Sequence, residues 1–207
     1  MLETQDMISF DEAGVCATCH QIEYKNNKID WEEREKELVR VLDEYRGKGL
    51  YDCIIPFSGG KDSTYQAYIL AKKYKLKPLL VNFDHGFYRP KTLANTERTI
   101  KKLGIAYMKF KPDWQVVKKL MRESLERKGD IMWHSHCGIY AYPMHIAVKF
   151  KIPLIIWGEP TSEYVSYYSY EDDEQVDEKR FNRVVNLGIN AEDMVGMLDG
   201  SVTLRDL

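Results

Sequence analysis

The chain has 207 residues, of which 44% are hydrophobic and 30% are charged, so it has enough apolar material for one packed core and is too polar for a membrane protein. Its 30 Lys and Arg side chains are nearly balanced by 32 Asp and Glu side chains, which excludes an overall positive field that holds nucleic acid by neutralising phosphates. No apolar run approaches the roughly 18 residues of a membrane span, and residues 1–11 contain no Lys or Arg, so we expect no spanning helix, no signal peptide and a cytoplasmic location.

The spacing of apolar residues changes several times between a helical and a strand period, and no internal repeat is present. The first helix is predicted over residues 31–46, where an amphipathic pattern stops at Gly47 and Gly49. Since short connections between strands of like direction need crossover helices, we expect a Rossmann-like, doubly wound parallel α/β sheet. The predicted strands are 51–57, 79–84, 105–111 and 154–157, and the predicted helices that follow the first are 62–75, 91–103, 113–128 and about 139–149.

The composition divides the chain into three parts. Residues 1–46 form a small N-terminal appendage with a Cys-x-x-Cys motif and a helix, and residues 47–160 form the α/β core. The third part, residues 161–207, begins with a segment rich in Tyr and acidic side chains (164–178), which we interpret as a flap over the site, a partner surface or a solvated excursion. Short helical patterns follow near 177–186 and 191–198, and we expect the chain to be truncated within a longer C-terminal helical part.

A glycine-rich segment, 57–63, lies between the first buried strand and the next helix. Gly59 and Gly60 let backbone N–H groups turn toward a ligand without interference from a Cβ, and the helix presents its own N–H groups and positive dipole end to an anion. The neighbouring side chains add two hydroxyl donors, a mobile positive charge and a carboxylate suited to magnesium or to a helix cap: Ser58, Ser63, Lys61 and Asp62. The segment therefore predicts a phosphate-binding loop.

Two common nucleotide-binding motifs do not fit this segment. A Walker A loop needs Gly five positions before the Gly-Lys pair and Ser or Thr after the Lys, where this chain has Ile55 and Asp62. The dinucleotide fingerprint fails because Gly59 and Gly60 are adjacent and no third glycine follows. Ser-Gly-Gly-x-Asp-Ser after a buried strand instead resembles the PP-loop of the ATP pyrophosphatase superfamily. This resemblance implies that the chain binds ATP and Mg²⁺ and cleaves ATP between the α and β phosphates.

Other stretches are similar to the N-acetyl sugar amidotransferases of surface-polysaccharide (lipopolysaccharide) biosynthesis, namely 10–19, 29–34, 138–143, 146–150 and 153–159. This resemblance implies an AMP- and pyrophosphate-forming enzyme that converts the acetamido group of a nucleotide-linked or free sugar to an acetamidino group. ATP would adenylate the amide oxygen, because an amide is otherwise too poor an electrophile for ammonia. The resemblance also implies a separate glutaminase of the imidazole-glycerol-phosphate-synthase type that supplies ammonia, with no membrane or nucleic-acid partner.

The candidate site residues come from the loop and from the ends of predicted strands. Asn82 and Asp84 lie at the end of the second strand and Glu159 follows the fourth, so all three are expected at the carboxyl edge of the sheet. We place Asn82 and Asp84 near the adenosine, and Glu159 near metal or substrate as a catalytic residue, while loop capping remains the alternative. The ATP-binding loop comprises Ser58, Gly59, Gly60, Lys61, Asp62 and Ser63, of which Lys61 and Asp62 are also catalytic candidates.

The cysteines favour a metal site or a redox pair over a disulfide framework. Cys16 and Cys19 have the spacing with which two thiolates bind one zinc ion, and a tetrahedral site needs four ligands. Cys53 lies within the first predicted strand and is interpreted as a small core residue. The zinc ligands that are missing could come from a cysteine pair upstream or from downstream side chains: His20, or Cys137 with its neighbours His134 and His136.

Two other functions compete with the amidotransferase hypothesis. In a PP-loop tRNA-modifying (thiolation-type) enzyme, Cys137 would handle sulfur, and residues 91–128, with 11 Lys or Arg against 4 Asp or Glu, would hold RNA. The same excess of positive charge is also expected on an ordinary solvated pair of helices or beside a nucleotide-sugar diphosphate. The second alternative is a nucleotide-binding fragment without turnover.

Overall fold

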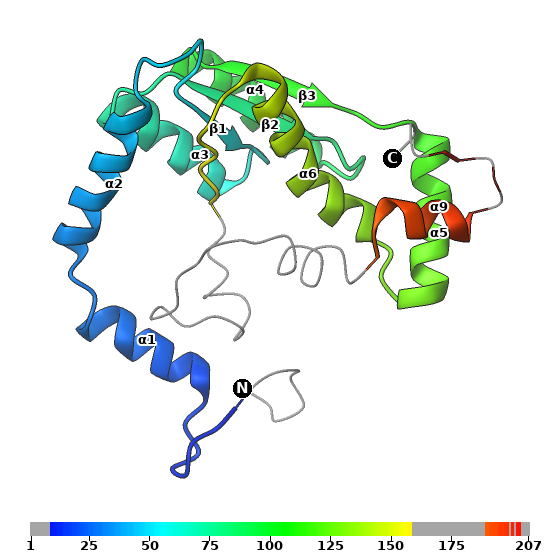
Figure 1. Cartoon of the computed structure of the whole chain (residues 1–207), viewed down its shortest axis with the longest axis horizontal. Helices are drawn as coiled ribbons and strands as arrows, with labels where there is room; N and C mark the ends of the chain where they lie inside the picture. Colours follow the sequence, from blue (N-terminus) through cyan, green and yellow to red (C-terminus); the bar gives the residue numbers. More distant parts are fainter. Residues whose placement is uncertain (1–8, 159–188, 199, 201, 204–207) are drawn as a thin grey trace. The chain divides into compact units, whose positions relative to one another are not determined.

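The structure is a computed structural model that describes residues 9–158, 189–198, 200, 202 and 203 (Figure 1). The chain divides into two compact units, one with the residues up to Glu44 and one that begins at Tyr45. The predicted flap, the helical pattern near 177–186 and Glu159 lie outside the described residues.

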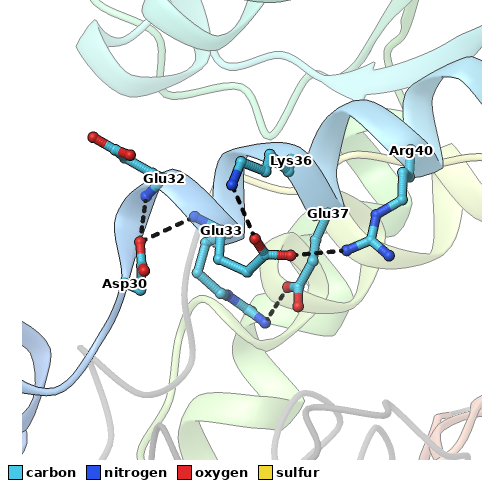
Figure 2. A network of polar contacts seen from close by, with 7 residues as sticks. Asp30, Glu32, Glu33, Lys36, Glu37 and Arg40 are labelled. Atoms are coloured by element: carbon cyan, nitrogen blue, oxygen red, sulfur yellow. Dashed lines mark hydrogen bonds and ion pairs between the residues drawn. The ribbon is translucent and has the colours of Figure 1, made fainter.

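The first unit contains α1 (Ala17–Asn27) and most of α2 (Trp31–Tyr45), which confirms the first predicted helix. Asp30 precedes α2, and its Oδ1 accepts hydrogen bonds from the backbone N–H groups of Glu32 at 3.0 Å and Glu33 at 3.1 Å. Along the helix, Glu33 pairs with both Lys36 and Arg40 (Figure 2). These pairs lie on an exposed face of α2, and each contributes only a few tenths of a kcal/mol, roughly, to the stability of the helix. α1 was not predicted, and none of its residues is buried.

The second unit is built on a parallel sheet in the order β1 (Cys53–Pro56), β2 (Pro78–Phe83) and β3 (Ala106–Phe110) (Figure 1). The predicted fourth strand is present as a single parallel bridge between Ile155 and Ile54, on the edge of β1 that β2 does not occupy. The N–H of Ile54 donates to the carbonyl oxygen of Leu154 and the N–H of Ile156 donates to that of Ile54, both at 2.9 Å. The chain therefore adds β2 and β3 on one side of β1 and then returns to its other side. In open α/β sheets such a reversal creates a crevice at the carboxyl end of the central strand.

Helices cover both faces of this sheet. On one face Ile54, Leu79 and Val81 pack with Ile146 and Ile152, from α6 (Trp133–Phe150) and the residues that follow it. Because side chains alternate along a strand, the fully buried Ile55 and Leu80 lie on the opposite face, where α3 (Lys61–Tyr68) packs against β1. The doubly wound α/β fold is therefore confirmed. The other helical elements among the described residues are the π-helical turn η1 (Ile69–Lys73), which continues α3, and α4 (Pro90–Leu103), α5 (Trp114–Lys128) and α9 (Ala191–Met197).

The start of α6 differs from the prediction. We expected a helix from about residue 139 and placed His134 and Cys137 before it, whereas α6 begins at Trp133 and contains both. Gly138 lies inside this helix, and a Cβ at this position would collide with the ring of Phe83. This glycine permits the close approach of α6 to β2 and does not break the helix. Within the part of the chain that the structure describes, no helix is both long and apolar enough to cross a membrane.

Candidate functional site

The glycine-rich segment forms the connection between β1 and α3, as predicted. The N–H of Phe57 donates to the carbonyl oxygen of Val81 at 2.8 Å, so the segment leaves the sheet still attached to β2. Gly59 then adopts φ +75° and Gly60 occupies the N-cap position of α3. The N–H of Gly60 donates to Oγ of Ser58 at 3.3 Å. This hydrogen bond is long and therefore weak. The N–H of Gly60 can instead donate to a stronger acceptor such as a phosphate oxygen.

Gly59 cannot be replaced by a larger residue without a rearrangement. Its positive φ is unfavourable for residues with a Cβ, and a Cβ here would collide with Oγ1 of Thr96 and lie 3.4 Å from the carbonyl oxygen of Thr92. Both threonines belong to α4, which lies directly behind the loop. The side-chain amide of Asn95, on the same helix, donates to the carbonyl oxygen of Gly59 at 2.9 Å. Sequence reasoning missed Thr96 and Asn95, because no motif connects α4 to the loop.

The first turn of α3 supplies the charged and hydroxyl groups of the loop. The side chains of Lys61 and Asp62 are 90% and 60% exposed, and Nζ of Lys61 lies 3.0 Å from Oδ1 of Asp62. Ser63 is buried, and its Oγ lies 3.2 Å from Oγ of Ser58. Because the first N–H groups of a helix have no acceptor within it, they add donors on the same side. This set of donors with one exposed cation suits the polyphosphate tail of a nucleotide.

Asn82 anchors the loop from β2. The residue is only 5% exposed, and its Nδ2 donates to the carbonyl oxygen of Phe57 and to the hydroxyl of Tyr88, each at 2.7 Å. Its buried Oδ1 has no hydrogen-bond partner among the described residues. A buried acceptor without a donor costs free energy, so Oδ1 is the atom with which Asn82 would contact a ligand. The predicted contact with adenosine stays a prediction.

Asp84 lies just beyond β2, and its buried carboxylate forms an ion pair with a partly exposed lysine that the sequence did not reveal. Its Oδ2 is 2.7 Å from Nζ of Lys109, near the end of β3, and its Oδ1 accepts from the N–H of Gly86 at 2.9 Å. Burial alone would raise the pKa of Asp84, but the hydrogen bonds from Lys109 and Gly86 and the charges of Lys109 and Lys111 lower it below its usual range. The rim therefore carries an ionised carboxylate with an attached ammonium group.

The side chains near the start of α6 do not assemble a metal site. Cys137 packs against the apolar cluster of Leu120, Trp133 and Met194, and burial raises the pKa of its thiol to about 12. His134 is buried, and its Nε2 lies 3.1 Å from Oγ of Ser135. No group of three or more His, Cys, Asp or Glu side chains that could hold a metal ion occurs in the described ranges. A role of Cys137 in zinc binding gains no support from these contacts.

The Cys-x-x-Cys motif is formed at the start of α1. The Sγ atoms of Cys16 and Cys19 are 3.5 Å apart, with Cys16 buried at the N-cap position and Cys19 exposed. Two hydrogen bonds lower the pKa of the Cys16 thiol. The larger effect comes from the backbone N–H of Cys19, and the smaller effect comes from the side chain of Cys19. His20 instead binds Asp11, with Nε2 and Oδ2 2.7 Å apart. Two thiolates fit half of a tetrahedral zinc site, and zinc stays a prediction.

The chain is similar to known proteins in part of its sequence and in its fold. No protein-family profile matches the chain. An uncharacterized protein of Methanocaldococcus jannaschii is 29% identical over 114 residues, which are 54% of this chain and 40% of the relative. The chain therefore spans about two fifths of the length of that curated relative.

Several solved structures are similar to the chain, among them the following three. NMN synthetase from Francisella tularensis matches with a TM-score of 0.51 and 16% identity over 86% of this chain and 84% of that one. NH3-dependent NAD synthetase from Campylobacter jejuni matches with a TM-score of 0.48 and 13% identity over 68% and 62%. A U34-tRNA thiolase from Methanococcus maripaludis matches with a TM-score of 0.40 and 21% identity over 62% and 45%. The first of these likenesses shows that the chain has the α/β fold of an NMN synthetase.

Proposed function

We propose that the chain is the ATP-binding part of a PP-loop enzyme that cleaves ATP between the α and β phosphates and releases pyrophosphate and AMP. One observation carries the proposal: Gly59 and Gly60 turn the backbone at the start of α3 into a set of N–H donors, in a place where α4 leaves no room for a Cβ. The fold, shared with a synthetase, supports it.

The loop is suited to pyrophosphate as a leaving group. The exposed ammonium of Lys61 can follow the charge that develops when the bond to the α phosphate breaks. The hydroxyls of Ser58 and Ser63 add donors on the same turn. Asp62, with its exposed carboxylate, is the residue of the loop that would hold Mg²⁺, which supplies neutralisation of phosphate charge when bound.

We further propose that the adenylated group is the oxygen of a sugar acetamido group. The amide oxygen attacks the α phosphorus and pyrophosphate departs; ammonia then adds to the activated carbon, and AMP leaves with the original amide oxygen. Ammonia would come from a separate glutaminase, and the reaction would take place in the cytoplasm. The stretches 138–143 and 146–150, which resemble the sugar amidotransferases, both lie in α6 against the sheet.

The packing of Cys137 is unfavourable for a tRNA thiolation reaction that uses this residue. A thiolation enzyme of this type would need Cys137 as a sulfur carrier, and the thiolate is the reactive form of cysteine. Burial among apolar side chains raises the pKa of Cys137 to about 12, so this thiol is protonated at neutral pH.

The test is incubation of the full chain with ATP, Mg²⁺, ammonium and a panel of nucleotide-linked acetamido sugars. Replacement of oxygen by NH lowers the mass of the sugar by one unit, and an ¹⁸O label in the acetamido group should appear in AMP. Formation of ADP instead of AMP would contradict the PP-loop function, whereas AMP formation that needs tRNA and no sugar would contradict the amidotransferase. Binding of Mg·ATP without release of pyrophosphate would mean that the chain is a nucleotide-binding module without turnover.

A further inference from the structure

The carbonyl group of Gly59 is held from behind by α4. Nδ2 of Asn95 donates to the carbonyl oxygen of Gly59 at 2.9 Å, and the other end of the same amide, Oδ1, accepts from a terminal nitrogen of Arg98 at 3.3 Å. Arg98 can only donate and the carbonyl can only accept, so the two contacts determine which way the amide of Asn95 faces. Asn95 is half-buried between them.

This contact sets the direction of the next N–H group. The peptide that joins Gly59 and Gly60 is trans, and in a trans peptide the C=O and N–H bonds point in opposite directions. Since the carbonyl of Gly59 points to α4, the N–H of Gly60 points away from α4. It reaches the open side of the loop, where Oγ of Ser58 lies 3.3 Å away.

The backbone alone would not maintain this orientation. Glycine populates positive and negative φ about equally, so the peptide between two glycines can rotate at little cost. In the rotated peptide the carbonyl oxygen would occupy the open side of the loop. A carbonyl dipole aimed at a phosphate repels it, whereas an N–H group attracts it, so the rotation would convert a binding group into a repulsive one.

We propose that Asn95 is the positioning residue of the phosphate-binding loop: by accepting from Arg98 and donating to Gly59, it prevents rotation of the 59–60 peptide and presents the N–H of Gly60 to phosphate. The inference rests on the proposed function for the nature of the ligand. Asn95 contacts the backbone of the loop and Arg98 rather than the phosphate, so its effect is on phosphate affinity.

The experiment uses pyrophosphate as the probe and three variants of the full chain. Asn95→Asp keeps the shape and the acceptor for Arg98 but removes the donor, and Asn95→Leu removes both. Lys101→Gln, on the exposed last turn of α4, changes the net charge by the same amount as Asn95→Asp and serves as the matched control. We expect both Asn95 variants to bind pyrophosphate about tenfold more weakly, which corresponds to the loss of one hydrogen bond, and Lys101→Gln to bind like wild type.

The amide signal of Gly60 in an NMR spectrum separates positioning from general destabilisation. In wild type it should shift on addition of pyrophosphate, whereas in the Asn95 variants it should already differ in the free protein and respond little to the probe. Wild-type affinity and shifts in a folded Asn95→Asp or Asn95→Leu variant would overturn the inference. If wild type itself fails to bind pyrophosphate, the proposed function fails, and the Gly60 signal of the free proteins still decides whether Asn95 orients the peptide.

Discussion

Replacement of Gly59 by alanine tests the geometry on which the proposed phosphate-binding loop depends. Two costs combine at this position. An L-residue at φ +75° costs about 1–2 kcal/mol, and overpacking against buried atoms costs about 1–3 kcal/mol. The second cost applies because the new Cβ would collide with Oγ1 of Thr96, which is itself only 8% exposed. We therefore expect Gly59→Ala to lower the free energy of unfolding by about 3 kcal/mol, which is about 6–12 °C in the melting temperature.

The chain offers a matched control for the first of these costs. Gly104 has φ +66°, and nothing lies within 4 Å of a Cβ built on it. Gly104→Ala should therefore cost only the backbone part, about 1–2 kcal/mol. The two alanine variants are compared by denaturant unfolding, followed by titration with pyrophosphate. Gly59→Ala should also weaken pyrophosphate binding, whereas Gly104→Ala should not.

A double-mutant cycle isolates the collision. Thr96→Ala removes Oγ1, so the Gly59→Ala/Thr96→Ala protein should recover about 1–2 kcal/mol relative to the sum of the single changes. The backbone cost should remain. Equal destabilisation by Gly59→Ala and Gly104→Ala, with additive behaviour in the cycle, would refute the close approach of α4 to the loop.

Three further predictions concern charge and thiol chemistry. Lys61→Ala should abolish pyrophosphate release but leave the melting temperature within about 2 °C, because its side chain is 90% exposed; a large loss of stability would contradict this placement. Ionised Asp84 has a lowered pKa in the folded chain, so it should stabilise the fold above about pH 4 and lose this contribution as the pH falls through that pKa. Unfolding of wild type and Asp84→Asn between pH 3 and 7 checks this, and a stability difference that grows toward low pH would be inconsistent with the Lys109 pair. A thiol reagent at neutral pH should modify the exposed Cys19 before Cys53 and Cys137, whose pKa values burial raises to about 12, and equal rates for these three cysteines by mass spectrometry would argue against the burial of Cys53 and Cys137.

Some elements could be predicted because their signals are local. The amphipathic pattern of α2 and the buried runs of β1 and β2 depend on residues a few positions apart, so their existence was confirmed with small shifts at the ends. α1 was missed for the same reason, since none of its residues is buried and its sequence has no apolar stripe. The loop 57–63 could be placed because two glycines after a buried run and before a helix have few other structural uses.

Contacts between distant segments could not be predicted from one sequence. Nothing near Asp84 marks Lys109 as its partner; the parallel register that brings β3 beside β2 creates the pair. Likewise, the position of Gly138 in α6 makes sense only once the ring of Phe83 is seen in the place of its Cβ. For Cys137, its neighbours in the sequence suggested metal binding, whereas its neighbours in space are apolar.

The sequence by itself determined that a glycine-rich turn connects the first strand to a helix, because the conformational freedom of Gly59 and Gly60 and the helix after them are properties of a short stretch of chain. Only the tertiary structure decided how that turn is held, since the threonine that excludes a Cβ and the amide that orients the peptide come from α4, more than 30 residues away along the chain. The direction of a backbone N–H group depends on what holds the carbonyl before it, and here that group is supplied by packing and not by local sequence.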